Sequence, residues 1–312
     1  MTPPARSALV HVGLNKAGST SIQGWLALNG PALAAQGVHH DDLGGTAGPA
    51  LGVPLGLPFL ALDSADPAWL PAPRHAARYA IATRADLAAR VRDFERRLDA
   101  SLPPSGTWVA SSEFVAGLLR TAPAIGALDR ALRARFASVR YLLYLRDPLD
   151  WLVSLWNQAV QGGSAQPLDA FLRAAARRDL DGIVRPWEAA VGDRLLLRLL
   201  QPDALVGGDL LADLAQALGA DLARTRRPPR LNEGLGRRRI RAMSLLNRAA
   251  RALRLDPPRR LIERVTRPLD GGPRLALTPA QAAAVMALQA PGLERLRRRR
   301  FPDRATLFGP PA

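Results

Sequence analysis

The chain of 312 residues contains no cysteine. This absence excludes disulfide bonds, a thiol nucleophile and metal sites with thiolate ligands. Histidine is scarce as well, because the chain holds only four. Two of them, His39 and His40, precede Asp41 and Asp42, but no further histidine lies at ligand spacing nearby. We therefore interpret 39–42 as a solvated turn and expect no metal site.

Long apolar runs are also missing. No run approaches the ~18 residues that span a bilayer. The richest stretch, LGVPLGLPFLAL at 51–62, is broken by proline and glycine. The apolar stretch that follows the first arginine runs into a glycine loop and is too short for the core of a signal peptide. We expect a soluble cytoplasmic protein.

Aromatic residues make up only 5% of the chain, whereas its net charge is +16. Such a charge favours polyanionic partners, unless it only reflects an arginine-rich composition. Arginine runs at 224–230, 237–241 and 297–300 are the candidates for a nucleic-acid surface. No nucleic-acid motif accompanies them, and leucine and alanine alternate with the arginines as on ordinary helices. We expect no nucleic-acid partner and leave peripheral contact with anionic surfaces open.

Lysine occurs once, as Lys16, among 43 basic residues. The chain uses arginine at every other basic position. Position 16 is therefore predicted to require the compact ammonium group of lysine rather than the planar guanidinium group of arginine.

The spacing of apolar residues predicts an α/β fold with three layers and a central, mainly parallel sheet. The expected strands are 8–14, 107–113, 139–146 and 194–200. Helical spacing covers 19–35, with a break expected at Gly30-Pro31, and a capping box at Thr83 and Asp86 begins a helix that runs to about 100.

Two further segments complete the predicted organisation. Residues 37–75 lack periodicity and are expected to be irregular. After about 225 the pattern is basic and helical. We predict one domain over 1–312, with a core at about 8–235 and a helical C-terminal cap at about 236–312.

The stretch HVGLNKAGSTSIQ begins at His11 and joins the first strand to the first helix. Gly13 and Gly18 have the spacing of a phosphate-binding loop, but Ser19 stands where lysine normally follows the second glycine. Free amides and hydroxyls of Gly18–Ser21 would hold an anion at the helix start. Lys16, inside the loop, would then stabilise charge on a leaving oxygen.

This loop resembles the 5′-phosphosulfate loop of sulfotransferases that use 3′-phosphoadenosine 5′-phosphosulfate (PAPS), particularly the bacterial branch. YLLYLRDPLDWLVSLWNQ resembles their second motif, and LNEGLG at 231–236 resembles a loop that closes over the nucleotide. Two positions depart from the family pattern: Ala17 replaces a common Thr or Ser, and Gly234 replaces a Ser.

The resemblance implies a P-loop-like sulfotransferase fold and transfer of a sulfuryl group from PAPS to a hydroxyl or amine acceptor, such as a saccharide or lipid. It implies that PAPS contacts these positions: Asn15, Lys16, Ala17, Gly18, Ser19, Thr20, Ser21, Arg146, Ser154 and Asn232. Arg146 and Ser154 would bind the 3′-phosphate, because an arginine fork and a helical hydroxyl can converge on one phosphate.

Glu113 ends the strand WVASSE and resembles the glutamate that some sulfotransferases use as the base. The alternatives for the base are His11, His39 and His40. Glu113 alternatively is the first-turn acid of a helix that begins at Ser112, and Arg146 and Asp147 alternatively form a structural turn. Acceptor-binding loops are expected at 37–80 and 160–190.

Two other functions remain open. A nucleotide kinase would require magnesium and a triphosphate donor. A polyanion-binding protein without catalysis would bind with an affinity that falls steeply with salt.

Overall fold

The computed structural model describes residues 6–43, 52–72, 80–229, 235–256 and 258–309. The chain divides into two compact units. The first consists of Met1–Leu145 and Ile183–Pro229, and the second consists of Arg146–Gly182 and Arg230–Ala312. The single-domain boundaries predicted from the sequence stay a prediction. In the described ranges, no helix is both long and apolar enough to cross a membrane.

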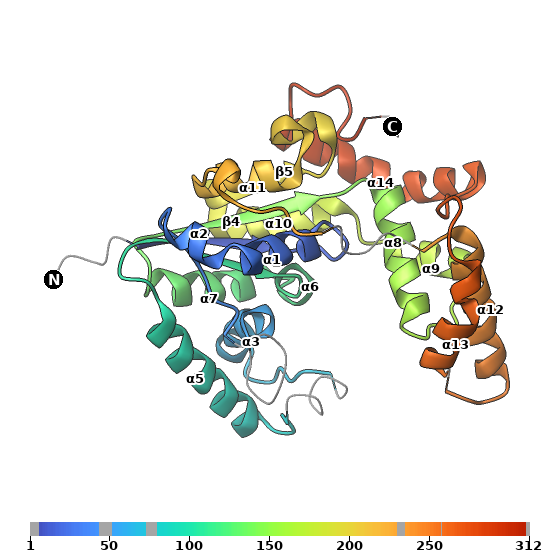
Figure 1. The fold of residues 1–312 in the computed structure, drawn as a ribbon, viewed down its shortest axis with the longest axis horizontal. Helices are drawn as coiled ribbons and strands as arrows, with labels where there is room; N and C mark the ends of the chain where they lie inside the picture. The colour runs from blue at the N-terminus through green and yellow to red at the C-terminus, as the bar shows by residue number, and fades with distance from the viewer. Residues whose placement is uncertain (1–5, 44–51, 73–79, 230–234, 257, 310–312) are drawn as a thin grey trace. The chain divides into compact units, whose positions relative to one another are not determined.

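The first unit contains a five-stranded parallel sheet in the order β2-β3-β1-β4-β5. Figure 1 labels β4 and β5 of this sheet. The α/β fold and parallel sheet predicted from the sequence are confirmed. Four strands lie where their apolar runs predict them, and the short edge strand β2 was missed. The bounds are β1 Arg6–Val12, β2 Val38–His40, β3 Gly106–Ser112, β4 Ser138–Leu145 and β5 Leu195–Leu199.

Helices cover both faces of this sheet. On β4, the Tyr141 hydroxyl donates to Asp129 of α7 at 3.0 Å, and the Tyr144 hydroxyl donates to Asp213 of α11 at 2.7 Å. Because these tyrosines are three residues apart on a strand, they point to opposite faces, and α7 and α11 therefore form separate layers. The helices around the sheet are α1 Ser19–Leu28, α2 Gly30–Ala34, α3 Val53–Ala65, α5 Arg84–Ser101, α6 Val115–Leu118, α7 Ala122–Arg133, α10 Leu180–Val191 and α11 Leu210–Leu218.

Local signals explain where several helices begin and end. The predicted capping box is present, since the Thr83 hydroxyl accepts from the Asp86 amide and the Asp86 carboxylate accepts from the Thr83 amide. The break predicted at Gly30-Pro31 separates α1 from α2. By contrast, the prediction of an irregular 37–75 segment is wrong for β2 and for α3, a helix whose residues from Val53 to Leu62 are almost all buried.

The second unit is helical, with α8 Pro148–Gln161, α9 Leu168–Ala175, α12 Arg237–Ala252, α13 Arg259–Thr266 and α14 Pro279–Arg300. Its core joins Trp156 and Val160 of α8 to Ile240 and Met243 of α12. Trp151 and Trp156 of α8 are both buried. On α14, Arg295 and Arg299 both donate to the buried carboxylate of Asp181, so part of the C-terminal arginine run serves structure.

Candidate active site

The glycine loop joins β1 to α1 at the carboxyl edge of the sheet. β1 is the middle strand, and the chain continues to β2 and β3 on one side of it before crossing to β4 on the other. In parallel α/β sheets, ligands bind at the carboxyl ends of strands where the order reverses in this way. The predicted loop therefore lies at the position of the sheet that suits a ligand best.

Gly13 and Gly18 allow close packing around this loop. The Gly13 amide donates to Ser112 O at 2.8 Å. A Cβ on Gly13 would lie 2.6 Å from Ser19 Oγ and 2.9 Å from Glu113 Cα. Gly18 has a φ of 89°, and a Cβ there would lie 2.4 Å from Leu210 Cδ2 on α11. Both positions thus require glycine, the second also because of its left-handed backbone.

The loop exposes Lys16 and the first turn of α1. Lys16 has a φ of 65°, a left-handed conformation that costs a non-glycine residue energy. Its side chain is exposed, as are those of Asn15, Thr20 and Ser21. Gly18 is the N-cap of α1 and offers no side-chain cap. Amides at such a helix start carry partial positive charge and favour anions.

Two of the residues that were predicted to contact PAPS are turned inward instead. Ala17 is buried and its amide donates to Leu14 O at 3.0 Å, so that amide is engaged within the loop. Ser19 is 4% exposed, and its Oγ is buried without a hydrogen-bond partner in the described residues. A ligand contact through the Ser19 hydroxyl or the Ala17 amide would require the loop to rearrange, whereas the Ser19 amide belongs to the first turn of α1.

Glu113 lies beside the glycine loop. It follows the last residue of β3, which is in register with the last residue of β1 (Val12 opposite Ser112). Its side chain is half-buried. The alternative of a helix beginning at Ser112 is wrong, because α6 begins at Val115 and Glu113 lies in the turn before it. The carboxylate is therefore available at the sheet edge rather than used as a first-turn acid.

Arg146 and Ser154 meet in the second unit. Arg146 follows directly after β4 in the chain, and its Nη1 donates to Ser154 Oγ on α8 at 3.0 Å. Its Nη2 lies 3.6 Å from Asp150 Oδ2. Asp147 caps α8 by accepting from the Leu149 amide, and burial raises the pKa of this carboxyl above its usual value. The structural turn therefore exists at Asp147, while Arg146 hydrogen-bonds Ser154; that both bind a 3′-phosphate stays a prediction.

The three histidines within the described residues, His11, His39 and His40, all lie in strands of the sheet. His11 is fully buried, its Nδ1 hydrogen-bonds Ser111 Oγ at 2.9 Å, and burial lowers its pKa to about 4. His39 and His40 lie in strand β2, not in the solvated turn that we predicted. A Cβ on Gly106, at the start of β3, would lie 3.3 Å from His39 Nε2. His39 thus lies near the opposite end of β3 from Glu113.

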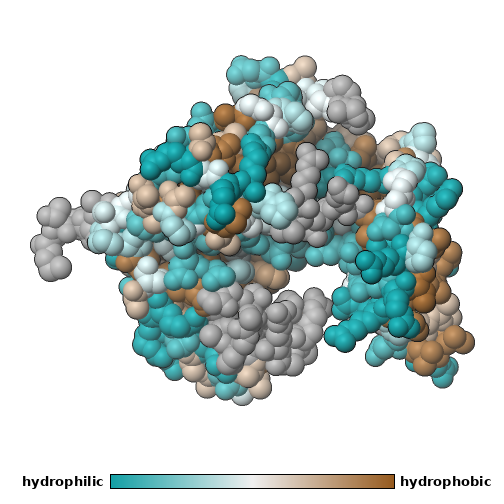
Figure 2. Space-filling view, in the orientation of Figure 1, coloured by the Kyte–Doolittle hydropathy of each residue, from teal (hydrophilic) through white to brown (hydrophobic). Residues whose placement is uncertain are grey.

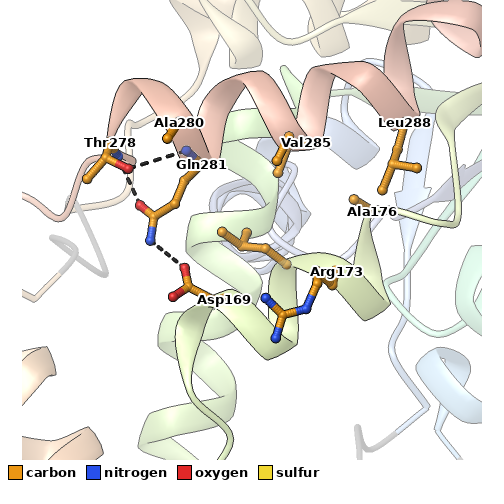
Figure 3. Close-up of a pocket in the computed structure, with 10 residues that line it drawn as sticks. Asp169, Arg173, Ala176, Thr278, Ala280, Gln281, Val285 and Leu288 are labelled. Carbon is orange, nitrogen blue, oxygen red and sulfur yellow. Dashed lines mark hydrogen bonds between the residues drawn. The ribbon is translucent and has the colours of Figure 1, made fainter.

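The second unit holds a mostly apolar cavity of about 360 Å³ between α9 and α14 (Figure 3). Gln281 of α14 donates to Asp169 of α9 at 2.6 Å at one end. Leu172, Val285 and Leu288 line the cavity, together with Arg173. The segment 160–190, expected to bind the acceptor, supplies the α9 side. The sequence did not indicate that α14 lines this cavity, because α14 lies about a hundred residues after α9 in the chain.

Asn232 and Gly234 lie outside the described residues. Leu210, which lies against Gly18 from far along the chain, was not identifiable from the sequence. In the portions of the chain that the structure describes, no three His, Cys, Asp or Glu residues are placed to hold a metal ion.

Comparison with known proteins gives one distant structural likeness. No protein-family model matches the chain, and no curated protein matches its sequence. Among solved structures, the chain is similar to a sulfotransferase from Alicyclobacillus acidocaldarius, with 11% identity, coverage of 96% of either chain and a TM-score of 0.47. A likeness at this level does not assign the chain to a family.

Proposed function

We propose that this protein is a sulfotransferase that moves a sulfuryl group from PAPS to a hydroxyl or amine acceptor. The observation that carries the proposal is the lysine-bearing glycine loop, which is hydrogen-bonded through Gly13 to the strand end that precedes Glu113. This hydrogen bond brings the glycine loop and the residue after β3, Glu113, to one edge of the sheet, which supports their proposed roles in anion binding and proton transfer. The pairing of Arg146 with Ser154 supplies a second phosphate-binding group.

The proposed chemistry is an in-line displacement. The acceptor oxygen or nitrogen forms a bond to sulfur while the bond from sulfur to the 5′-phosphate oxygen breaks. Glu113 takes the acceptor's proton, as a general base does. The ammonium of Lys16 stabilises the negative charge that develops on the leaving phosphate oxygen. The products are the sulfated acceptor and adenosine 3′,5′-bisphosphate.

The proposed donor contacts divide into two groups. Exposed Thr20 and Ser21, with the first amides of α1, hold the 5′-phosphate. The fork of Arg146 and the hydroxyl of Ser154 bind the 3′-phosphate, which distinguishes PAPS from other adenine nucleotides. We propose a saccharide or lipid as the acceptor.

A thermal-shift titration with adenosine 3′,5′-bisphosphate tests this function. A ligand that binds only the folded state at about a hundred times its Kd is expected to raise the melting temperature by about 5 °C. We expect the same rise with and without magnesium, and a much smaller one with adenosine 5′-monophosphate. A rise with magnesium and ATP but none with the bisphosphate would instead support a kinase. A salt-sensitive rise with any polyanion would support a binding protein without catalysis.

A further inference from the structure

Helix α12 has two apolar faces, only one of which the core of the second unit uses. Ile240 and Met243 belong to that core, together with Trp156 of α8. A second set of residues recurs at helical spacing on the opposite side of α12. We call this set the outer face of α12, and it consists of Ala242, Leu245, Leu246, Ala249, Ala252 and Leu253.

The outer face is exposed to solvent. Leu245 is 62% exposed and Leu253 is 71% exposed. On α13, Leu261 and Val265 are also exposed and lie one turn apart. Seven of the ten large apolar side chains that are exposed in the described residues fall within 245–269. Figure 2 shows brown, apolar surface beside teal, polar surface over the region of α12 and α13. Concentrated exposure of this kind indicates an interaction surface.

Arginine is the most frequent charged residue in α12, in α13 and in the residues between and after them. Residues 237–269 contain eleven arginines and two acids, Asp256 and Glu263, and α12 itself contains no acid. Arg241 and Arg248 are four and three residues from Leu245 and therefore flank it on the helix. Most of these guanidinium groups have no hydrogen bond or ion pair within the described ranges: Arg237, Arg238, Arg241, Arg248, Arg254, Arg260, Arg264 and Arg267.

The combination of leucine and arginine decides the kind of partner. A second copy of the chain docking through this face would bring arginine against arginine, which is unfavourable. A nucleic acid would neutralise the arginines but leave the leucines without an apolar environment. A bilayer with anionic headgroups satisfies both, because leucines enter the boundary of the acyl chains while arginine stems extend to the phosphates.

We propose that the outer face of α12, with the exposed residues of α13, binds an anionic lipid bilayer surface. The surface lies within the second unit and does not depend on the sulfotransferase proposal. Binding would keep the protein at a membrane, with the helices lying in the interface rather than crossing it.

Sedimentation of the full-length protein with vesicles tests this proposal. We expect binding to an equal mixture of phosphatidylglycerol and phosphatidylcholine and far weaker binding to phosphatidylcholine alone. The double variant Leu245→Asn/Leu253→Asn is expected to lower the partition coefficient at least about tenfold. Arg241→Gln/Arg248→Gln is expected to lower it about thirtyfold.

Matched controls come from the first unit. Leu70 is an exposed leucine, and Arg92 and Arg96 are exposed arginines of α5. Leu70→Asn and Arg92→Gln/Arg96→Gln are expected to partition as the unmodified protein does. All substituted side chains are exposed, and melting temperatures within about 2 °C of the parent verify that the variants fold.

Three results would overturn the proposal. The first is equal binding to vesicles with and without phosphatidylglycerol. The second is unchanged vesicle binding by the leucine double variant, which would indicate a purely electrostatic polyanion site. The third is a dimer in solution that this variant converts to a monomer, which would show that the face pairs with a second copy.

Discussion

Arg146 donates through Nη1 to the hydroxyl of Ser154 at 3.0 Å, across the first two turns of α8. If this pair binds a 3′-phosphate, Arg146→Ala should remove a charged hydrogen bond and lower the preference for adenosine 3′,5′-bisphosphate over adenosine 5′-monophosphate at least about tenfold. Calorimetric titration of both nucleotides measures that ratio. Arg140→Ala, on the same strand β4, is the control and should leave it unchanged. An unaltered ratio in the Arg146 variant would remove this residue from the site.

Lys16 combines a left-handed backbone with an exposed ammonium. Lys16→Met should lower kcat of sulfuryl transfer about 10²- to 10³-fold, since the charge on the leaving oxygen loses its stabilisation. Lys16→Gly should be equally inactive but more stable by roughly 0.5–1 kcal/mol, because glycine relieves the left-handed strain. Steady-state kinetics and urea unfolding measure the two effects. Transfer at the full rate by either variant would disprove the role of the ammonium.

Glu113 is expected to accept the acceptor's proton. Glu113→Gln keeps the size of the side chain and removes its basicity, so kcat should fall about 10²- to 10³-fold while the affinity for adenosine 3′,5′-bisphosphate stays the same. Glu263→Gln, at an exposed position of the second unit, is the control. A variant that loses nucleotide affinity but not kcat would show that Glu113 supports the loop rather than the chemistry.

Gly13 packs too tightly for any side chain. Its added Cβ would lie 2.9 Å from the backbone of Glu113, so Gly13→Ala should lower the free energy of unfolding by about 1–3 kcal/mol and weaken nucleotide binding. Gly30→Ala is the matched control, since nothing lies within 4 Å of its added Cβ. Urea denaturation of both variants gives the comparison, and equal stability would contradict the packing described for the loop.

Buried His11 should make stability depend on pH. Its pKa falls from 6.5 to about 4 in the folded protein because burial disfavours the charged ring. The unfolded chain therefore binds the extra proton first, and the free energy of unfolding should fall as pH drops from 7 to 4. The contribution is about 3 kcal/mol at roughly 1.4 kcal/mol per pH unit. Urea unfolding should show this loss in the parent and a smaller one in His11→Asn. Parallel pH profiles would rule out the assignment.

Much of the fold follows from local patterns. Four strands, the Thr83 capping box and the break at Gly30-Pro31 each depend on residues within a few positions, and each is present as predicted. Helix α3 was missed because Pro54, Gly56 and Pro58 oppose helix formation. Its stability comes from packing instead: a Cβ on Gly56 would lie 2.2 Å from Phe94 of α5, so the glycine allows two helices to approach closely.

The candidate site also has features that the sequence predicts and features that it does not. The glycine loop, Glu113 and the motif that carries Arg146 and Ser154 were recognisable because each is a short stretch that begins at the end of a strand. The inward orientation of Ser19 and the packing of Leu210 on Gly18 were not, since both depend on segments far apart in sequence. The exposure of the outer face of α12 was not predictable, because the sequence alone does not show whether an apolar stripe on a helix is buried or exposed.

The brevity of β2 has a consequence for the behaviour of the protein in concentrated solution. This strand occupies one end of the strand order and spans only Val38–His40. An edge strand of three residues offers few unpaired N–H and C=O groups with which a strand of another molecule could pair. Short edge strands of this kind are one of the ways in which proteins limit edge-to-edge aggregation.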